Sequence, residues 1–233
     1  MEQFLEFAKG SLFAGSFVIM VLGLARTAFI TLWGTKNALD KAGDKNIPYK
    51  ALIKETFEWM IPIKHITNSR SAISIVSVVF HIGLIIVPLF LLDHILLWQK
   101  LGLSWPGIPA AIANVLTITT IVTGGILLLN RIFHRDTRFL SSVIDYALLV
   151  LILAIFINGF IASKPFNPIP YNLVMVIHVM AGNLILILVP FSKLAHCFLY
   201  PIMRIASNIA WHFPARAGEE VNKTLYGEEN KKV

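Results

Sequence analysis

The sequence predicts an all-α membrane protein with five transmembrane helices. The chain has 233 residues, of which 56% are hydrophobic and only 14% are charged, whereas a soluble domain carries about 25% charged residues. Five apolar runs are each about as long as the roughly 20 residues that an α-helix needs to cross a bilayer. These runs cover residues 11–33, 71–98, 110–130, 143–162 and 173–200.

Basic residues in the connecting segments predict the orientation of the five spans. Fifteen Lys and Arg lie in alternate segments, namely 34–70, 131–142 and 201–233. The other three segments, 1–10, 99–109 and 163–172, hold one lysine each. Because Lys and Arg accumulate in cytoplasmic loops, we expect the N-terminus outside and the C-terminus in the cytoplasm.

The second span, residues 71–98, carries two histidines at different depths. His81 lies about ten residues from the inner end, and His94 lies near the outer end. Thirteen residues turn an ideal α-helix by about 220°, so the two side chains would not share a face of a straight helix. Pro88 lies between them, and a proline kink or a π-bulge would change this phase.

The fifth span, residues 173–200, carries a second pair of histidines. His178 and His196 are eighteen positions apart, so both would leave one face of a continuous helix about 27 Å apart. That separation is nearly the depth of the hydrocarbon core, roughly 30 Å. One imidazole would then lie near each membrane surface, and ionisable groups at such depths predict a functional site.

Antiparallel packing of the second and fifth spans would bring the four histidines together in two pairs. His81 would lie at the depth of His196, and His94 at the depth of His178. Paired histidines are the expected ligands of electron-transferring b haems. The chain has no CxxCH motif, which excludes the usual covalent attachment of a c-type haem. We therefore predict a bundle that holds two stacked haems b, each bound non-covalently between two histidines.

Further residues are candidates for contact with the haems. Gly83 and Gly182 follow proposed ligands by two and four residues, and Gly124 and Gly125 lie within the third span. Small residues leave room for a haem macrocycle beside a helix, but they also permit ordinary packing between helices. Arg26 is a cation within the first span, where charge is costly, so we expect it to reach the inner surface or to pair with a haem propionate.

The loop 34–70 is the largest segment outside the spans, and its second half predicts an amphipathic helix. This helix either lies on the inner membrane surface or docks a soluble partner, and the sequence leaves both interpretations open. His65 in this loop and His134 in the loop 131–142 lie outside the hydrocarbon, so we expect neither to bind haem. Residues 1–200 thus form a five-helix di-haem membrane domain, and residues 201–233 form a cytoplasmic tail.

Three segments resemble the gamma subunit of respiratory nitrate reductase, the di-haem cytochrome b that anchors that complex in the prokaryotic cytoplasmic membrane. They are FHIG at 80–83, GGILLLNRIF at 124–133 and PFSKLAH at 190–196, and the wider resemblance covers all five spans. It implies that His81 and His196 bind an inner haem and that His94 and His178 bind an outer one. It also implies that menaquinone or another quinone exchanges electrons at the outer haem, and that a cytoplasmic iron–sulfur protein and a catalytic subunit are the partners.

The sequence departs from that family at two places. The family's second-helix ligands are closer together, and Leu91, which stands at the closer spacing, cannot bind iron. The lysine at the start of the family's third helix has no counterpart in PGIPAAIAN. Membrane subunits of heterodisulfide-reductase-like complexes share the architecture and fit as well, and the b-type anchor of a hydrogenase or formate dehydrogenase is a weaker candidate.

A haem-free transporter or structural membrane anchor is the alternative from another class. In that case the four histidines would form hydrogen bonds between helices. Transporters often contain internal repeats and broken helices, and the sequence shows no such repeat. The expected protein is therefore a redox subunit. It carries out no chemistry beyond quinol oxidation or quinone reduction, and no residue is predicted to be catalytic.

Overall fold

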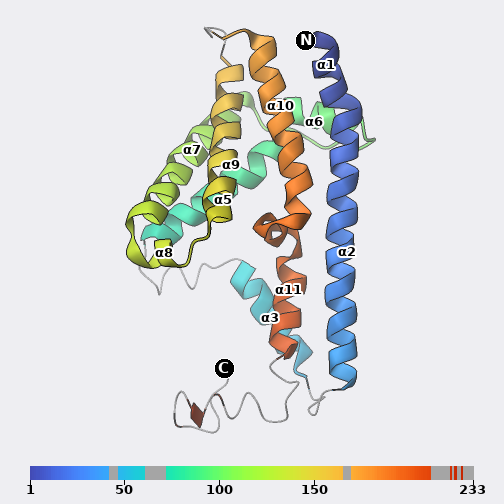
Figure 1. The fold of residues 1–233 in the computed structure, drawn as a ribbon, viewed down its shortest axis with the longest axis vertical. Helices are drawn as coiled ribbons and strands as arrows, with labels where there is room; N and C mark the ends of the chain where they lie inside the picture. The colour runs from blue at the N-terminus through green and yellow to red at the C-terminus, as the bar shows by residue number, and fades with distance from the viewer. Residues whose placement is uncertain are drawn as a thin grey trace. The chain divides into compact units, whose positions relative to one another are not determined.

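The computed structural model describes residues 1–41, 47–60, 72–164, 169–210, 221, 223–224 and 227. The named elements in these ranges are all helical (Figure 1). Five of the described helices are long and apolar enough to cross a membrane, namely Glu2–Asp40, Ala72–Phe90, Ala110–Phe133, Val143–Ala162 and Tyr171–Phe191. Each coincides with one predicted span, so the prediction of an all-α protein with five membrane-spanning helices is confirmed.

The chain divides into two compact units. One contains Met1–Ile19 and His65–Ile187, and the other contains Met20–Lys64 and Leu188–Val233. The predicted boundary between membrane domain and tail, at residue 200, lies within the second unit. There the helix α11, His196–Ala210, continues across it.

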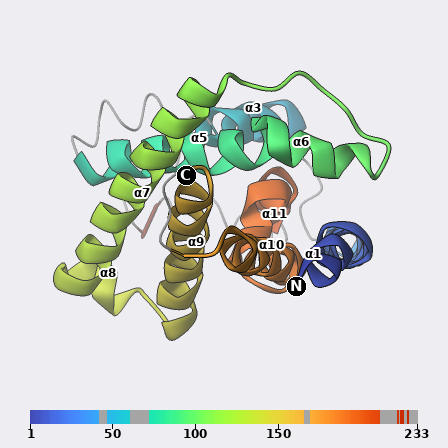
Figure 2. The same cartoon turned by 90° about the horizontal axis from the view of Figure 1, so that it is seen from above.

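The first unit contains most of the membrane-spanning segments. It begins with α1 (Glu2–Phe7), a π-helical turn (Ala8–Leu12) and the start of α2 (Phe13–Asp40). It continues with α5 (Ala72–Phe90), α6 (Leu92–Gln99), α7 (Ala110–Phe133), α8 (Arg135–Phe139), α9 (Val143–Ala162) and α10 (Tyr171–Leu188). The helix α7 packs against both α5 and α9 (Figure 2).

The N-terminal helix of this unit packs against α10. Leu5, Ala8 and Val179 form one buried apolar cluster. The side-chain amide of Asn183, which is itself buried, donates a hydrogen bond to the carbonyl of Ala8 at 3.0 Å. A buried amide without such a partner would cost about 1–3 kcal/mol, so this bond fixes α10 against the π-helical turn.

The helices α5 and α7 are in close contact at Gly83. A Cβ atom added there would collide with Oγ1 of Thr120, and Thr120 is completely buried. We expect Gly83→Ala to lower the free energy of unfolding by about 1–3 kcal/mol, the usual effect of overpacking a core. Thermal unfolding in detergent measures the change, with Gly125→Ala as control because an added Cβ at Gly125 contacts nothing within 4 Å. Equal stability of the two variants would contradict this packing.

Two of the membrane-spanning helices end earlier than the sequence predicts. The second span was expected to continue to residue 98, but α5 ends at Phe90 and Leu91 is extended, with φ −65° and ψ 129°. Pro88 precedes this break. A proline lacks the backbone N–H that continues a helix, and the chain leaves the helix three residues later.

The fifth span was expected to continue to residue 200, and this prediction is also wrong. The helix α10 ends at Leu188 and is followed by two 3₁₀ turns, Val189–Phe191 and Lys193–Ala195. Ser192 between them is extended, with φ −133° and ψ −179°. The helical phases calculated for straight spans therefore apply neither to His81 and His94 nor to His178 and His196.

The second unit contains the rest of α2, the helix α3 (Tyr49–Met60), the two 3₁₀ turns and α11. The helices α3 and α11 pack together. Their contact is a buried cluster of Ile47, Leu52 and Ile209, with Leu39 and Ile205 at its edge. A helix is thus present where the loop 34–70 was expected to contain one, whereas His65 lies outside the described residues.

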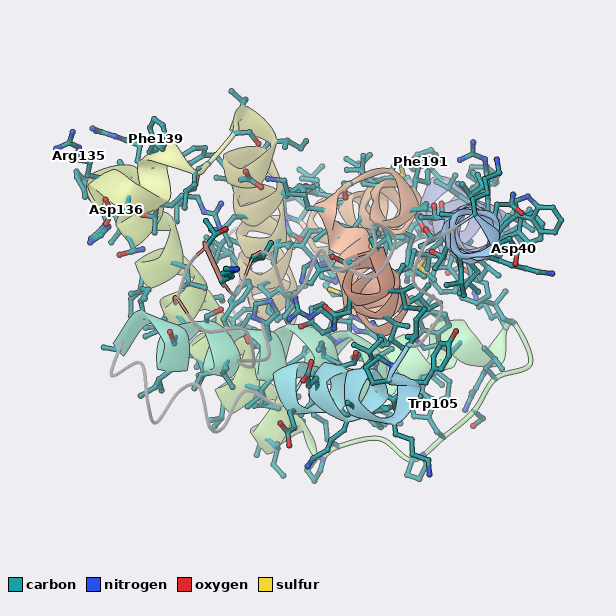
Figure 3. The ribbon with its side chains drawn as sticks, turned by 90° about the horizontal axis from the view of Figure 1, so that it is seen from below. Asp40, Trp105, Arg135, Asp136, Phe139 and Phe191 are labelled. Carbon is teal, nitrogen blue, oxygen red and sulfur yellow. The ribbon has the colours of Figure 1, made fainter. Side chains whose placement is uncertain are left out.

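The turn between α7 and α9 is held together by polar contacts. Arg131 donates to Oγ of Ser141 at 3.2 Å and forms an ion pair with Asp145 at 4.0 Å. Arg135, Asp136 and Phe139, which lie on the surface of this turn, are exposed to solvent. Figure 3 shows the side chains of Arg135, Asp136 and Phe139 pointing away from the helices.

Candidate functional site

The first unit brings His94 of α6 and His178 of α10 together. Their ring centroids are 6.0 Å apart, and the ring planes are inclined by only 17°. Two imidazoles that bind one metal ion from opposite sides, through bonds of about 2 Å, would have centroids roughly 6 Å apart. The two histidines that the sequence assigns to the outer haem are therefore neighbours, and their rings are stacked.

The end of α5 positions His94. The last four carbonyls of an α-helix have no partner within the helix. The carbonyls of Val87, Pro88, Leu89 and Phe90 accept hydrogen bonds from Leu91 N at 3.0 Å, His94 Nδ1 at 3.2 Å, Trp105 Nε1 at 2.8 Å and Ile108 N at 2.9 Å, respectively. Each carbonyl at the break thus has a partner, and one of those partners is the imidazole of His94.

Three of the four predicted ligands hold Nδ1 against a backbone carbonyl. His81 contacts the carbonyl of Ser77 at 2.7 Å, His94 that of Pro88 at 3.2 Å, and His196 that of Lys193 at 2.5 Å. A carbonyl only accepts hydrogen bonds, so Nδ1 must carry the proton. In the neutral ring Nε2 then keeps its lone pair. Metal-binding histidines are commonly oriented in this way, by a hydrogen bond from the ring nitrogen that does not bind the metal.

His178 is positioned by close contact with α9. A Cβ atom added at Gly159 would lie 2.7 Å from Cε1 and 3.2 Å from Nδ1 of His178, so only glycine leaves room for this ring. Nδ1 of His178 is buried, and the ring also meets the backbone of Ile155 in the same helix. Two positions of α9, one helical turn apart, thus hold this ring in place.

The sequence analysis did not identify Gly159. Its only signal is the Asn158–Gly159 pair, which interrupts the apolar run 147–162 of the fourth span. The structure places this position of the fourth span directly against the ring of His178.

The glycines that were proposed to admit a haem lie in different surroundings. Gly83 packs against Thr120, and Gly124 lies against Phe80 and Leu153, so both allow helices to approach each other. Gly182, one helical turn after His178, faces open space, since an added Cβ would meet nothing within 4 Å. Among these three glycines, Gly182 is the one with free volume beside a proposed ligand.

His81 and His196 belong to different compact units, and their pairing stays a prediction. His81 is half-buried in α5. His196 is the first residue of α11 and lies outside the five candidate spans. Sγ of Cys197, 3.9 Å from Nε2, accepts a hydrogen bond from the protonated ring and raises the pKa of His196 to about 9. Nε2 of His196 must therefore lose a proton before it can bind a metal ion.

Two other predicted features can be placed. Arg26 is exposed on α2, within the second unit. His134, between α7 and α8, is also exposed. No group of three or more His, Cys, Asp or Glu side chains that could hold a metal ion occurs among the residues that the structure describes.

Comparison with known proteins adds one relative. No protein-family model matches the chain, and no solved structure matches it. The chain is similar to a protein of Nitratidesulfovibrio vulgaris (strain Hildenborough), with 28% identity over 203 residues that cover 85% of this chain and 89% of that protein. That relative is described only as "Protein", which names no activity. Its similarity shows a counterpart of comparable extent in that organism, and the function must be inferred from the histidine pair.

Proposed function

We propose that this protein is the membrane-anchoring di-haem cytochrome b subunit of a redox complex. It would transfer electrons between the quinone/quinol pool and a cytoplasmic iron–sulfur subunit. The observation that carries the proposal is the pair formed by His94 and His178, whose rings lie 6.0 Å apart and nearly parallel. His94 lies on α6, just after the candidate span α5, and His178 lies within the candidate span Tyr171–Phe191, so the pair joins two regions that are distant in the sequence.

The residues at this pair fit a bis-histidine haem. His94 and His178 would hold the outer haem b, and His81 and His196 the inner one. A haem bound between two histidines supplies one-electron transfer at a potential that the ligands tune. The chain orients its ligands: the carbonyl of Pro88 fixes the tautomer of His94, and Gly159 admits the ring of His178.

The proposed electron carriers and partners follow from the membrane setting. Menaquinone or another quinone dissolves in the bilayer and would exchange electrons on the side of the outer pair. An iron–sulfur protein, together with a catalytic subunit, would bind on the cytoplasmic side, where fifteen Lys and Arg of the connecting segments are expected. The protein would reside in the cytoplasmic membrane of a prokaryotic cell.

The visible spectrum of the purified protein tests this function. We expect the α-band of a reduced b-type cytochrome and two haems per chain, because the four histidines would form two ligand pairs. Pyridine haemochrome analysis and the protein concentration give the ratio. A colourless preparation that is monodisperse and helical would overturn the proposal and favour the haem-free anchor or transporter.

The orientation can be tested with single cysteines in a Cys197→Ser background. Asp136 in α8 and Ser104 between α6 and α7 are both exposed, and they lie in segments that are expected on opposite sides of the membrane. We expect an impermeant thiol reagent to label Ser104→Cys from outside intact cells, and Asp136→Cys only after the cells are opened. The reverse pattern would contradict the predicted orientation.

A further inference from the structure

The helix α3 carries an apolar stripe that remains exposed. Tyr49, Ile53, Phe57 and Met60 are exposed by 49%, 46%, 59% and 45%. Their spacing of four, four and three residues places them on one face of the helix. The helix lies outside the five candidate spans, so immersion in the hydrocarbon core does not account for this stripe.

The other side of the apolar surface is already occupied. Leu52 and Thr56 are buried, and Leu52 belongs to the cluster that α3 shares with Ile209 of α11. At 100° per residue, Leu52 and Thr56 adjoin the exposed stripe on one side. The contact with α11 thus covers only half of a broad apolar face, and it leaves Tyr49, Ile53, Phe57 and Met60 outside.

Charged residues are ordered around α3 relative to this stripe. On a helical projection, Lys50 and Lys54 lie about 65° and 105° from the centre of the stripe, whereas Glu55 and Glu58 lie about 155° and 145° from it. The lysines therefore border the apolar stripe, and the acidic side chains occupy the opposite side. Helices that lie in a membrane interface show this order of apolar, basic and acidic residues.

We propose that the exposed stripe of α3 lies in the interface of an anionic leaflet. The apolar side chains contact the upper part of the acyl chains, and the ammonium groups of Lys50 and Lys54 reach the phosphates of the headgroups. Lysine stems can lie along apolar surface while the charge stays in the polar layer, and Tyr49 is of a residue type that is enriched at this depth.

The connection to α2 keeps α3 near the membrane. The helix α2 is a candidate span that ends at Asp40, and α3 begins nine residues later, at Tyr49. Nine residues extend over roughly 30 Å at most. A soluble protein on this surface would not require lysines at the border of the stripe and glutamates opposite, whereas an anionic leaflet accounts for both.

Lipid contact can be measured on the full-length protein in nanodiscs. An environment-sensitive fluorophore is attached to Ile53→Cys in a Cys197→Ser background, with Glu55→Cys as the matched control on the same helix. We expect brominated acyl chains to quench the fluorophore at position 53, and aqueous iodide to quench the one at position 55. In the Lys50→Gln/Lys54→Gln variant, the equilibrium for lipid contact should fall about 30-fold, since each lysine near an anionic surface contributes about fivefold.

Three results would overturn the proposal. Equal quenching by brominated lipid at positions 53 and 55 would show that the stripe does not face the bilayer. Protection of position 53 from both brominated lipid and iodide would show that a protein covers it. Lipid contact that persists unchanged without anionic lipid, or without both lysines, would exclude the headgroup contact. None of these outcomes depends on bound haem, so the test is independent of the proposed electron transfer.

Discussion

Replacing either His94 or His178 by alanine is expected to remove one of the two proposed haems from each chain and to stop reduction by quinol. Each variant deletes one of the two imidazoles that would share an iron, so a single ring would remain to hold it. Haem content per chain measures the loss, and a redox titration should retain only the component that belongs to His81 and His196. Both variants should give the same result, because they destroy the same site.

The control for this experiment is His134→Ala, which removes an exposed histidine far in sequence from both proposed pairs. It should keep two haems. Stable insertion of the His94→Ala and His178→Ala proteins must be shown by their helicity and monodispersity. If a stably inserted His94→Ala protein retains two haems and quinol activity, His94 is not a ligand, and the partner of His178 lies elsewhere.

A single methyl group at residue 159 should weaken the outer haem site as well. In Gly159→Ala the new Cβ would lie 2.7 Å from Cε1 of His178, so the imidazole must move away from the position that faces His94. Loss of a group that orients a metal ligand lowers affinity by about 10–100-fold, and we expect a loss of this size for the outer haem. Titration of haem into the apo-protein measures it.

Gly125→Ala is the matched control, since it adds the same methyl group to a membrane-spanning helix where nothing lies within 4 Å. Alanine favours a helix over glycine by about 1 kcal/mol, so neither substitution should weaken its own helix. A loss of haem affinity in Gly159→Ala alone would therefore report on the position of His178. Unchanged affinity in both variants would show that the ring is not required where the structure places it.

The five spans could be predicted from the sequence because hydrocarbon imposes a simple requirement. About 20 apolar residues in succession suffice to identify a span, without any knowledge of the neighbouring helices. The breaks after Phe90 and Leu188 could not be placed in this way. Pro88 indicated a distortion, but the chain leaves the helix where Trp105 and Ile108 provide donors for its last carbonyls. Those donors come from a loop whose position depends on the tertiary structure.

The site around the histidine pair could likewise be predicted from the sequence only in part. Depth in the membrane was enough to associate His94 with His178, although helical phase argued against it. The phase argument failed because it assumed a straight helix through Leu91, where the structure has an extended residue. Gly159 could not be found from depth or phase, since its importance lies in a steric contact between two helices. Contacts of that kind depend on rotation about the helix axes, which composition does not encode.

The hydrogen bond between His94 and Pro88 bears on the order of events during biogenesis. Because the backbone carbonyl holds the imidazole without help from any cofactor, one ligand is oriented as soon as α5 and α6 have formed. If the pair binds haem as proposed, the ring would not have to be ordered again when iron binds, which would lower the entropic cost of binding. Insertion of the cofactor would then be able to follow membrane insertion of the completed chain.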